Sequence, residues 1–261
     1  MSIEVEPQWW KTLFDDIYLI TDARSVCDQE ITAVEMDLVC GLLDLKPVHR
    51  VLDLCGGHGR HSMELYRRGI INCTLVDYSS FLVGRAKEEA QKQNFALHCV
   101  RADARDTGLP SDTFDAVIIM GNSMGYGEHA EWDLHILQEA RRLLCKGGQL
   151  LVDVVDGGWI CESFNPRTWH EIGDDVIVCR MRELLKGRVN VREVVLSRKR
   201  GLLRDQSYSI RFYNPSSMKK LFQKAGLSDI EVHRDFSPHI REGDYGCMNN
   251  RMIVIGHKEV V

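Results

Sequence analysis

The sequence predicts an α/β protein built around a mostly parallel sheet. From His49 onward, short apolar runs alternate with helix-length amphipathic segments, the pattern that connects parallel strands through helices. The length of 261 residues suits one large domain with an elaboration. A composition of 44% hydrophobic and 27% charged residues is that of a globular protein, which excludes disordered, collagen-like and coiled-coil chains.

Two helices are expected before the alternating region. An apolar stripe at helical spacing predicts the first helix, and its members are Trp10, Leu13, Phe14, Ile17 and Tyr18. The second helix is expected at 28–43, because Asp28 is a suitable N-cap and apolar residues follow on one face. Both helices would lie outside the main sheet.

The alternating region is expected to hold most of the parallel strands. The predicted strands lie at 50–54, 73–77, 96–101, 114–120 and 149–155, and the predicted helices at 59–68, 79–92 and 132–145. The last helix would end at Lys146-Gly147-Gly148, because glycine favours a helix C-terminus.

Beyond Val155 the pattern changes to that of antiparallel hairpins. Alternating segments at 175–184, 188–197 and 207–213 are separated by glycine-containing turns. A helix at 215–225 and strands at 230–234 and 251–257 would return to the sheet. We therefore expect an N-terminal helical lid at 1–48, a core at 49–158 and 214–261, and an inserted antiparallel cap at 159–213.

Charge gives little reason to expect a nucleic acid or membrane partner. The formal net charge is −5, although nine basic residues stand against two acidic ones between 180 and 204. These charges alternate with valines, which favours the solvated face of an antiparallel sheet over a nucleic acid-binding surface. No apolar stretch approaches the roughly 18 to 20 residues that cross a bilayer, and no secretion signal is expected.

The nine cysteines are scattered singly, without a C-x-x-C pair. This spacing favours reduced thiols, a cytoplasmic location and no metal site.

The most informative stretch is the glycine-rich loop after the first predicted strand, 53–59 (DLCGGHG). Glycines let the backbone adopt positive φ or approach a ligand closely, and this end of a parallel sheet is where ligands bind. A dinucleotide fingerprint would need a third glycine where Ser62 stands, and a phosphate-binding P-loop would need a lysine that is missing. The loop is therefore suited to the floor of another cofactor site.

The pattern Asp53-x-Cys55-x-Gly57-x-Gly59 resembles the D/E-x-G-x-G-x-G motif of class I S-adenosylmethionine-dependent methyltransferases, with Cys55 replacing the first glycine. The resemblance extends over 10–257 and includes 140–150, which is similar to the family's approach to its fifth strand. It implies a Rossmann-like seven-stranded fold, S-adenosyl-L-methionine as cofactor and S-adenosyl-L-homocysteine as product.

The resemblance also implies the cofactor contacts. Asp77 ends the second predicted strand, where an acid can accept hydrogen bonds from both ribose hydroxyls. Asp103 and Ala104 match the segment that meets the adenine in the family. The other implied cofactor residues are Tyr18, Asp53, Cys55, Gly56, Gly57, Gly59, Tyr78, Met120, Gly121 and Asn122.

The methyl acceptor has to be predicted from weaker signals. Residues 122–126 lack the [DNS]-P-P-[YF] motif of methyltransferases that act on base or amide nitrogen, which favours a small molecule held between core and cap. His129 and Tyr126 are candidate catalytic residues, because an imidazole near the fourth strand can take a proton at neutral pH. Arg211 and Tyr213 are candidate substrate contacts, because related small-molecule enzymes have a similar R-x-Y segment and a guanidinium can hold a carboxylate. A structural ion pair is an equal alternative for Arg211.

Two alternative functions remain open at this stage. The basic segment would also suit methylation of a protein or an RNA. A protein that only senses S-adenosylmethionine, or serves as a partner subunit, would share the fold and the cofactor site. The oligomeric state is not predicted.

Overall fold

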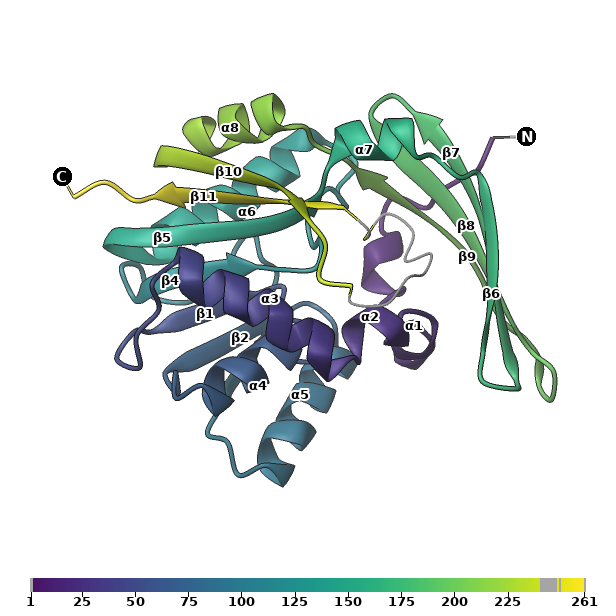
Figure 1. Ribbon diagram of the computed structural model, residues 1–261, viewed down its shortest axis with the longest axis horizontal. Helices are drawn as coiled ribbons and strands as arrows, with labels where there is room; N and C mark the ends of the chain where they lie inside the picture. The colour runs from purple at the N-terminus through teal and green to yellow at the C-terminus, as the bar shows by residue number, and fades with distance from the viewer. Residues whose placement is uncertain (1, 240–247, 249, 261) are drawn as a thin grey trace.

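Two separate sheets organise the computed structural model (Figure 1). The short helices α1 (Asp16–Thr21) and α2 (Ala23–Val26), called here the N-terminal helices, lie between the sheets. The structure describes residues 2–239, 248 and 250–260, so part of the predicted core segment 214–261 lies outside the described residues. Within these residues, no helix is long and apolar enough to cross a membrane.

The larger sheet has seven strands in the order β10-β11-β5-β4-β1-β2-β3. Their bounds are β1 Val51–Leu54, β2 Cys73–Asp77, β3 His98–Arg101, β4 Phe114–Ile119, β5 Leu144–Val155, β10 Ser228–Phe236 and β11 Arg251–His257. β1 to β5 pair in parallel, whereas β11 is antiparallel to both of its neighbours. The predicted mostly parallel α/β sheet is confirmed.

Helices cover both faces of this sheet. α3 (Gln29–Leu42), α4 (Arg60–Arg67) and α5 (Ser80–Lys92) lie on one face, and α6 (Ala130–Leu143) and α8 (Pro215–Lys224) lie on the other (Figure 1). Met36 and Leu65 pack with Ile118 on the first face, while Leu137 and Phe222 pack beneath the second. Burial of these apolar faces is the main stabilising contribution that the helices make.

One strand boundary in the core differs from the prediction. β5 begins at Leu144, directly after α6, so Lys146-Gly147-Gly148 lies inside the strand and does not end the helix. Leu144 has extended backbone angles, and its fully buried side chain joins the core. Tertiary packing thus decides a boundary that the glycine signal misplaced.

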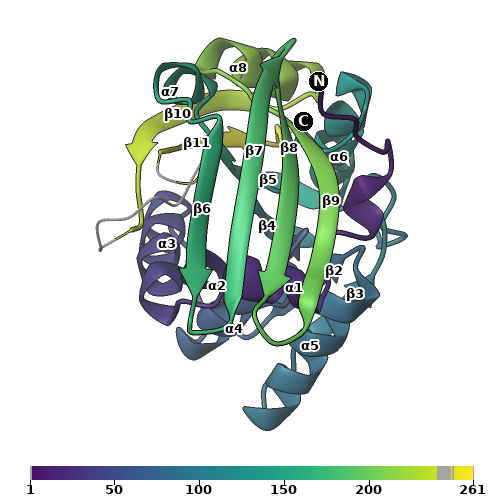
Figure 2. The same ribbon diagram turned by 90° about the vertical axis from the view of Figure 1, so that its right-hand side faces the viewer.

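The smaller sheet is the antiparallel cap. It contains β6 (Arg167–Ile172), β7 (Val176–Leu185), β8 (Arg188–Ser197) and β9 (Gly201–Arg211), and Figure 2 shows it face-on in front of the core. The prediction of three strands missed β6, whose sequence carries few apolar residues, and placed the start of β9 six positions too late. A short helix, α7 (Gly157–Glu162), leads from β5 toward the cap.

The N-terminal segment contains shorter helices than predicted. The single helix expected from the Trp10–Tyr18 stripe is wrong, because the chain forms the 3-10 turn η1 (Trp9–Lys11) and then α1 (Asp16–Thr21) and α2 (Ala23–Val26). Asp15 interrupts the stripe and caps α1, accepting a hydrogen bond from the Tyr18 amide at 3.1 Å. The predicted N-cap of α3 is present, since Asp28 accepts bonds from two amides of its first turn.

Candidate functional site

A cavity of about 290 Å³ lies where the carboxyl ends of the parallel strands face the N-terminal helices and the inner side of the cap. Ligands of open α/β sheets bind at this edge. The residues predicted from sequence that line the cavity are Tyr18, Cys55, Gly56, Gly57, Asp77, Tyr78, Asp103, Ala104, Met120, Gly121, Asn122 and Tyr126. They come from segments far apart in the sequence, and the fold brings them to one space.

The backbone of the glycine loop faces the cavity most directly at Gly57. This residue has φ of +58°, and a side chain added there would meet only Leu82, at 3.7 Å, before entering open space. Its amide donates a hydrogen bond to Asp77 Oδ2 at 2.8 Å. Cys55, which replaces the first glycine of the motif, also has a positive φ, of 62°, a conformation that costs energy for a residue with a side chain.

Asp77 is the anion at this end of the cavity. Its second oxygen accepts a bond from the Ser79 amide at 2.8 Å, so the carboxylate links the glycine loop to the start of α5. Burial raises the pKa of Asp77 to about 6, although the two amide donors favour the charged form. Each carboxylate oxygen has a further lone pair, so Asp77 can still accept two hydroxyl groups.

Two predicted cofactor residues support the loop from beneath and do not line the cavity. Asp53 is fully buried and accepts a 2.7 Å bond from the Ser62 hydroxyl. A side chain at Gly59 would lie 3.1 Å from Leu75 and 3.2 Å from Ala86, so glycine is needed there for helix packing. Asp53 and Gly59 therefore support the loop structurally, and their contact with the cofactor stays a prediction.

Asp103 sits in an aromatic corner of the cavity. Its carboxylate accepts hydrogen bonds from the Arg105 guanidinium at 2.9 and 2.5 Å, which lowers the pKa of Asp103. The Arg105 guanidinium lies 4.1 Å from the centroid of the Trp132 ring, and the Trp10 ring lies 4.8 Å from that of Tyr78. Trp10 and Trp132 both line the cavity, so this corner offers aromatic surface to a flat ring.

A second aromatic group connects the core to the cap. Tyr126 lies with its ring 5.0 Å from that of Trp9 and 5.6 Å from that of Phe14, and Phe14 contacts Tyr18 at 5.0 Å. Trp9 and Phe14 were not predicted as site residues from the sequence, but both line the cavity. Burial raises the pKa of Tyr126 well above its ordinary value, so its phenol stays neutral and can act as a hydrogen-bond donor.

Three predicted acceptor residues lie outside the cavity lining. His129 is exposed at the N-cap of α6. Arg211 pairs with Asp133 at 2.6 Å, and the Tyr213 hydroxyl donates a hydrogen bond to the same carboxylate. The side chains of Arg211 and Tyr213 therefore fasten the cap to α6, and none of the three residues lines the cavity.

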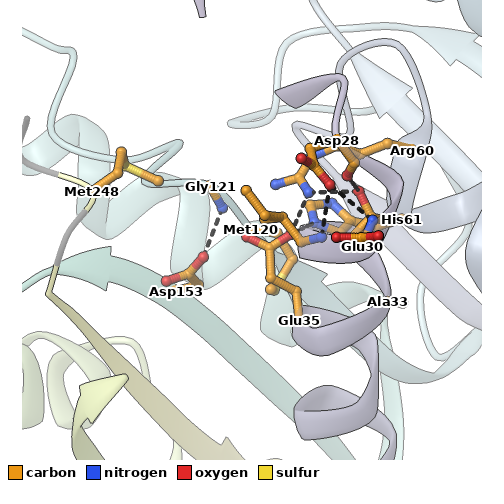
Figure 3. A network of polar contacts seen from close by, with 12 residues as sticks. Asp28, Glu30, Ala33, Glu35, Arg60, His61, Met120, Gly121, Asp153 and Met248 are labelled. Atoms are coloured by element: carbon orange, nitrogen blue, oxygen red, sulfur yellow. Dashed lines mark hydrogen bonds and ion pairs between the residues drawn. The ribbon is translucent and has the colours of Figure 1, made fainter. Parts of the chain in front are cut away.

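Sequence reasoning missed a largely buried ion network in one wall of the cavity, and Figure 3 labels its members Glu35, Arg60, His61 and Asp153. Glu35 accepts a bond from Arg60, contacts His61 at 3.0 Å and pairs with Arg251 at 2.5 Å. Arg251 also pairs with Asp153 at 2.6 Å. A glutamate on the apolar side of α3 was the available signal, but its partner lies 216 positions away along the chain.

This network reaches the turn after β4. Asp153 Oδ2 accepts a 2.9 Å bond from the Gly121 amide, and Gly121 lines the cavity (Figure 3). The pKa of Glu35 lies well below its ordinary value because Arg60 and Arg251 outweigh the effect of burial, which alone would raise it. The network therefore fixes one wall of the cavity through largely buried charged groups.

The basic stretch of the cap is not simply a solvated face. Arg180 and Arg204 are largely buried and share Glu193, with distances of 2.8 and 3.1 Å. Arg180 also contacts Asp22 at 3.1 Å, and Arg204 pairs with Asp15. The interpretation as a wet face is wrong for these two arginines, because they bind the N-terminal helices to the inner side of the cap.

The described residues contain no group of three or more His, Cys, Asp or Glu side chains placed to hold a metal ion.

Comparison with known proteins gives a local match in sequence. Residues 51–148 match the family described as "Methyltransferase domain". "EEF1A lysine methyltransferase 4" of Mus musculus is 32% identical over 119 residues, 41% of this chain and 46% of that protein. "27-O-demethylrifamycin SV methyltransferase" of Amycolatopsis mediterranei is 28% identical over 131 residues, 49% and 47% of the two chains. The chain spans about half the length of the curated relatives that it matches.

Solved structures match over nearly the whole chain. An S-adenosylmethionine-dependent methyltransferase from Clostridium acetobutylicum has a TM-score of 0.74 at 15% identity, covering 93% of this chain and 96% of that one. CalS10 from Micromonospora echinaspora, an amino pentose methyltransferase solved with S-adenosylmethionine bound, has a TM-score of 0.68 at 15% identity, with coverage of 95% and 98%. At this identity the likeness shows a shared fold, and that fold includes the cap.

Proposed function

We propose that this chain is a class I S-adenosylmethionine-dependent methyltransferase that methylates a small molecule. Its residues 51–148 match a methyltransferase-domain family, and its fold is shared with a solved S-adenosylmethionine-dependent methyltransferase. The observation that carries the proposal is the cavity, which runs from the glycine loop to the inner side of the cap. It offers a cofactor end and an acceptor end in one continuous space.

The cofactor end has the chemistry that S-adenosylmethionine requires. Gly57 leaves room where any side chain would enter the cavity, and Asp77 retains acceptor capacity for two ribose hydroxyls. Asp103 and the aromatic rings of Trp10 and Tyr78 suit the adenine. When bound there, S-adenosylmethionine supplies a methyl group on a sulfonium, which is already activated for displacement.

The contribution of the protein is alignment and exclusion of water. Methyl transfer breaks the bond between the methyl carbon and sulfur while the acceptor forms a new bond to that carbon, and the electron pair of the broken bond stays on sulfur. Holding the two reactants in line can contribute about 7 to 11 kcal/mol to such a reaction. Tyr126 is neutral, half-buried and in ring contact with Trp9 and Phe14, so it would orient the acceptor by a hydrogen bond and would not remove its proton.

The enclosed acceptor end favours a small molecule over a protein. The cap and the N-terminal helices are joined by the pairs of Arg180 with Asp22 and Arg204 with Asp15, which close this side of the cavity. The amino pentose acceptor named for CalS10 agrees with this reading. The lysine methyltransferase relative names a protein acceptor instead, but that similarity covers only 41% of this chain.

Calorimetric titration with S-adenosylmethionine and S-adenosylhomocysteine tests the cofactor site without knowledge of the acceptor. Both should bind to wild-type protein, and Asp77→Ala should lose binding while its circular dichroism spectrum is kept. Asp115→Ala is the matched control, because Asp115 pairs with Arg50 on the surface away from the cavity. Failure of folded wild-type protein to bind either compound would refute the proposal.

Labelled methyl transfer then distinguishes the acceptor classes. A panel of small amines, alcohols, thiols and amino sugars is compared with a panel of lysine-containing peptides and folded proteins. Methylation within the first panel alone supports a small-molecule enzyme. Methylation of the second panel alone would contradict the proposed substrate class, and tight cofactor binding without transfer would favour a sensor or partner subunit.

A further inference from the structure

We propose that the cap end of the cavity is an anion-binding subsite centred on Arg182, and that the methyl acceptor carries a carboxylate or a phosphate group. This inference rests on the proposed function, because it names the chemistry of the molecule that occupies the acceptor end. It follows from how the charges that line the cavity are paired.

Arginines that line the cavity are mostly held by carboxylates of the protein. Among the described residues, those with such a partner are Arg60, Arg105, Arg180, Arg204 and Arg251. Arg182 also lines the cavity, but its side chain makes only a long contact of 3.4 Å to the backbone carbonyl of Asn165. Within the described part of the chain, no carboxylate forms an ion pair with it.

The position of Arg182 in the cap places this residue at the acceptor end of the cavity. In the register of the cap, Arg182 on β7 pairs with Val191 on β8, which pairs with Tyr208 on β9, and all three residues line the cavity. They form one row across the inner face of the sheet. The Tyr208 ring lies 5.5 Å from Trp9, which in turn contacts Tyr126, so aromatic side chains connect this row with the cofactor end.

Tyr208 adds a second donor to this row. Burial raises the pKa of its phenol, so the hydroxyl keeps its proton at neutral pH and can donate a hydrogen bond. The guanidinium of Arg182 presents two parallel N–H groups, a geometry that matches the oxygens of a carboxylate or a phosphate. Arg182 and Tyr208 thus place one charged and one neutral hydrogen-bond donor in the same row of the cap, where an anion could bind.

Binding of an acceptor changes the environment of the charge on Arg182. An acceptor that occupies the cap end displaces water from Arg182, and a guanidinium without water or a counter-charge is unfavourable. An anionic group on the acceptor removes that cost, whereas a neutral acceptor leaves it. The remainder of the acceptor would lie against Trp9 and Tyr126, which favours a molecule with an apolar or aromatic body.

Binding of simple aromatic probes tests the subsite. Benzoate, phenyl phosphate and neutral benzamide are titrated into wild-type protein with and without saturating S-adenosylhomocysteine, with tryptophan fluorescence and calorimetry as readouts. At least one of the two anions should bind about 10- to 100-fold more tightly than benzamide, the range expected for hydrogen bonds to a charged group. Preference for benzoate would identify a carboxylate, and preference for phenyl phosphate a phosphate.

Arg182→Gln should abolish this preference while binding of S-adenosylhomocysteine is unchanged, and Tyr208→Phe should reduce it. The matched control is Arg192→Gln on β8, because Arg192 is an exposed arginine of the same sheet, pairs with Asp205 and does not line the cavity. Equal binding of benzamide and both anions, no binding of any probe, or an unchanged preference in Arg182→Gln would overturn the inference. Because S-adenosylhomocysteine is titrated separately, failure of the subsite is distinguished from failure of the cofactor site.

Discussion

Replacement of Arg251 by methionine should destabilise the protein more than loss of a surface arginine. The Arg251 side chain is fully buried between Glu35 and Asp153, with ion-pair distances of 2.5 and 2.6 Å. Methionine fills much of the same space but leaves Asp153 with the Gly121 amide as the only other hydrogen-bond donor found among the described residues. Breaking a buried pair on one side costs about 3 to 5 kcal/mol.

That loss can be measured as a change in melting temperature. Each kcal/mol shifts the midpoint by about 2 to 4 °C for a chain of this length, so Arg251→Met should melt roughly 6 to 20 °C below wild type. Urea denaturation gives the free energy of unfolding independently. The control Arg192→Met removes an exposed arginine and should leave the midpoint nearly unchanged.

The pH dependence of this variant provides a second check. Burial already raises the pKa of Asp153 against the opposing effect of Arg251, and without Arg251 it should rise further. A carboxyl whose pKa is higher in the folded than in the unfolded state stabilises the fold as pH falls. The gap between variant and wild type should therefore narrow from pH 8 to pH 5. A loss below about 1 kcal/mol, or a gap that widens in acid, would refute this account of the network.

Three further predictions concern the cavity. Burial raises the pKa of Asp77 to about 6, and its charged form is the one proposed to accept the ribose hydroxyls. S-adenosylhomocysteine affinity should therefore rise between pH 5 and pH 7, and calorimetry of Asp77→Asn should show this dependence lost. Gly57→Ala should keep the fold, at a cost of about 1 kcal/mol for its positive φ, and should weaken cofactor binding. Gly56→Ala should mainly lower the melting temperature, because its new carbon would lie 2.7 Å from Asp53. The opposite pattern would contradict the roles assigned to the two glycines. Asp22→Ala should speed cofactor release about two- to fivefold in stopped-flow measurements, because it removes a partly exposed ion pair with Arg180. An unchanged rate would show that this pair does not hold the N-terminal helices over the cavity.

Some site residues could be placed from local sequence, whereas the positions of others depend on contacts between distant segments. Asp53 in the first strand, the glycine loop and Asp77 follow one another within 25 positions, so spacing alone was enough to place Gly57 and Asp77 at the cavity. Arg211 and Tyr213 were predicted at the acceptor because their residue types suit a substrate. They lie instead on Asp133, a partner 80 positions from Tyr213 that no local pattern could reveal.

The sequence by itself determined the fold class and the cofactor end of the cavity. Period-two and helical patterns are local consequences of which face is buried, and a loop that needs positive φ shows its glycines directly. Only the tertiary structure decided the rest: the burial of Arg180 and Arg204, and the unpaired state of Arg182 within the described chain. Each depends on which charges meet across the gap between the lid, core and cap, and that pairing has no counterpart in local spacing.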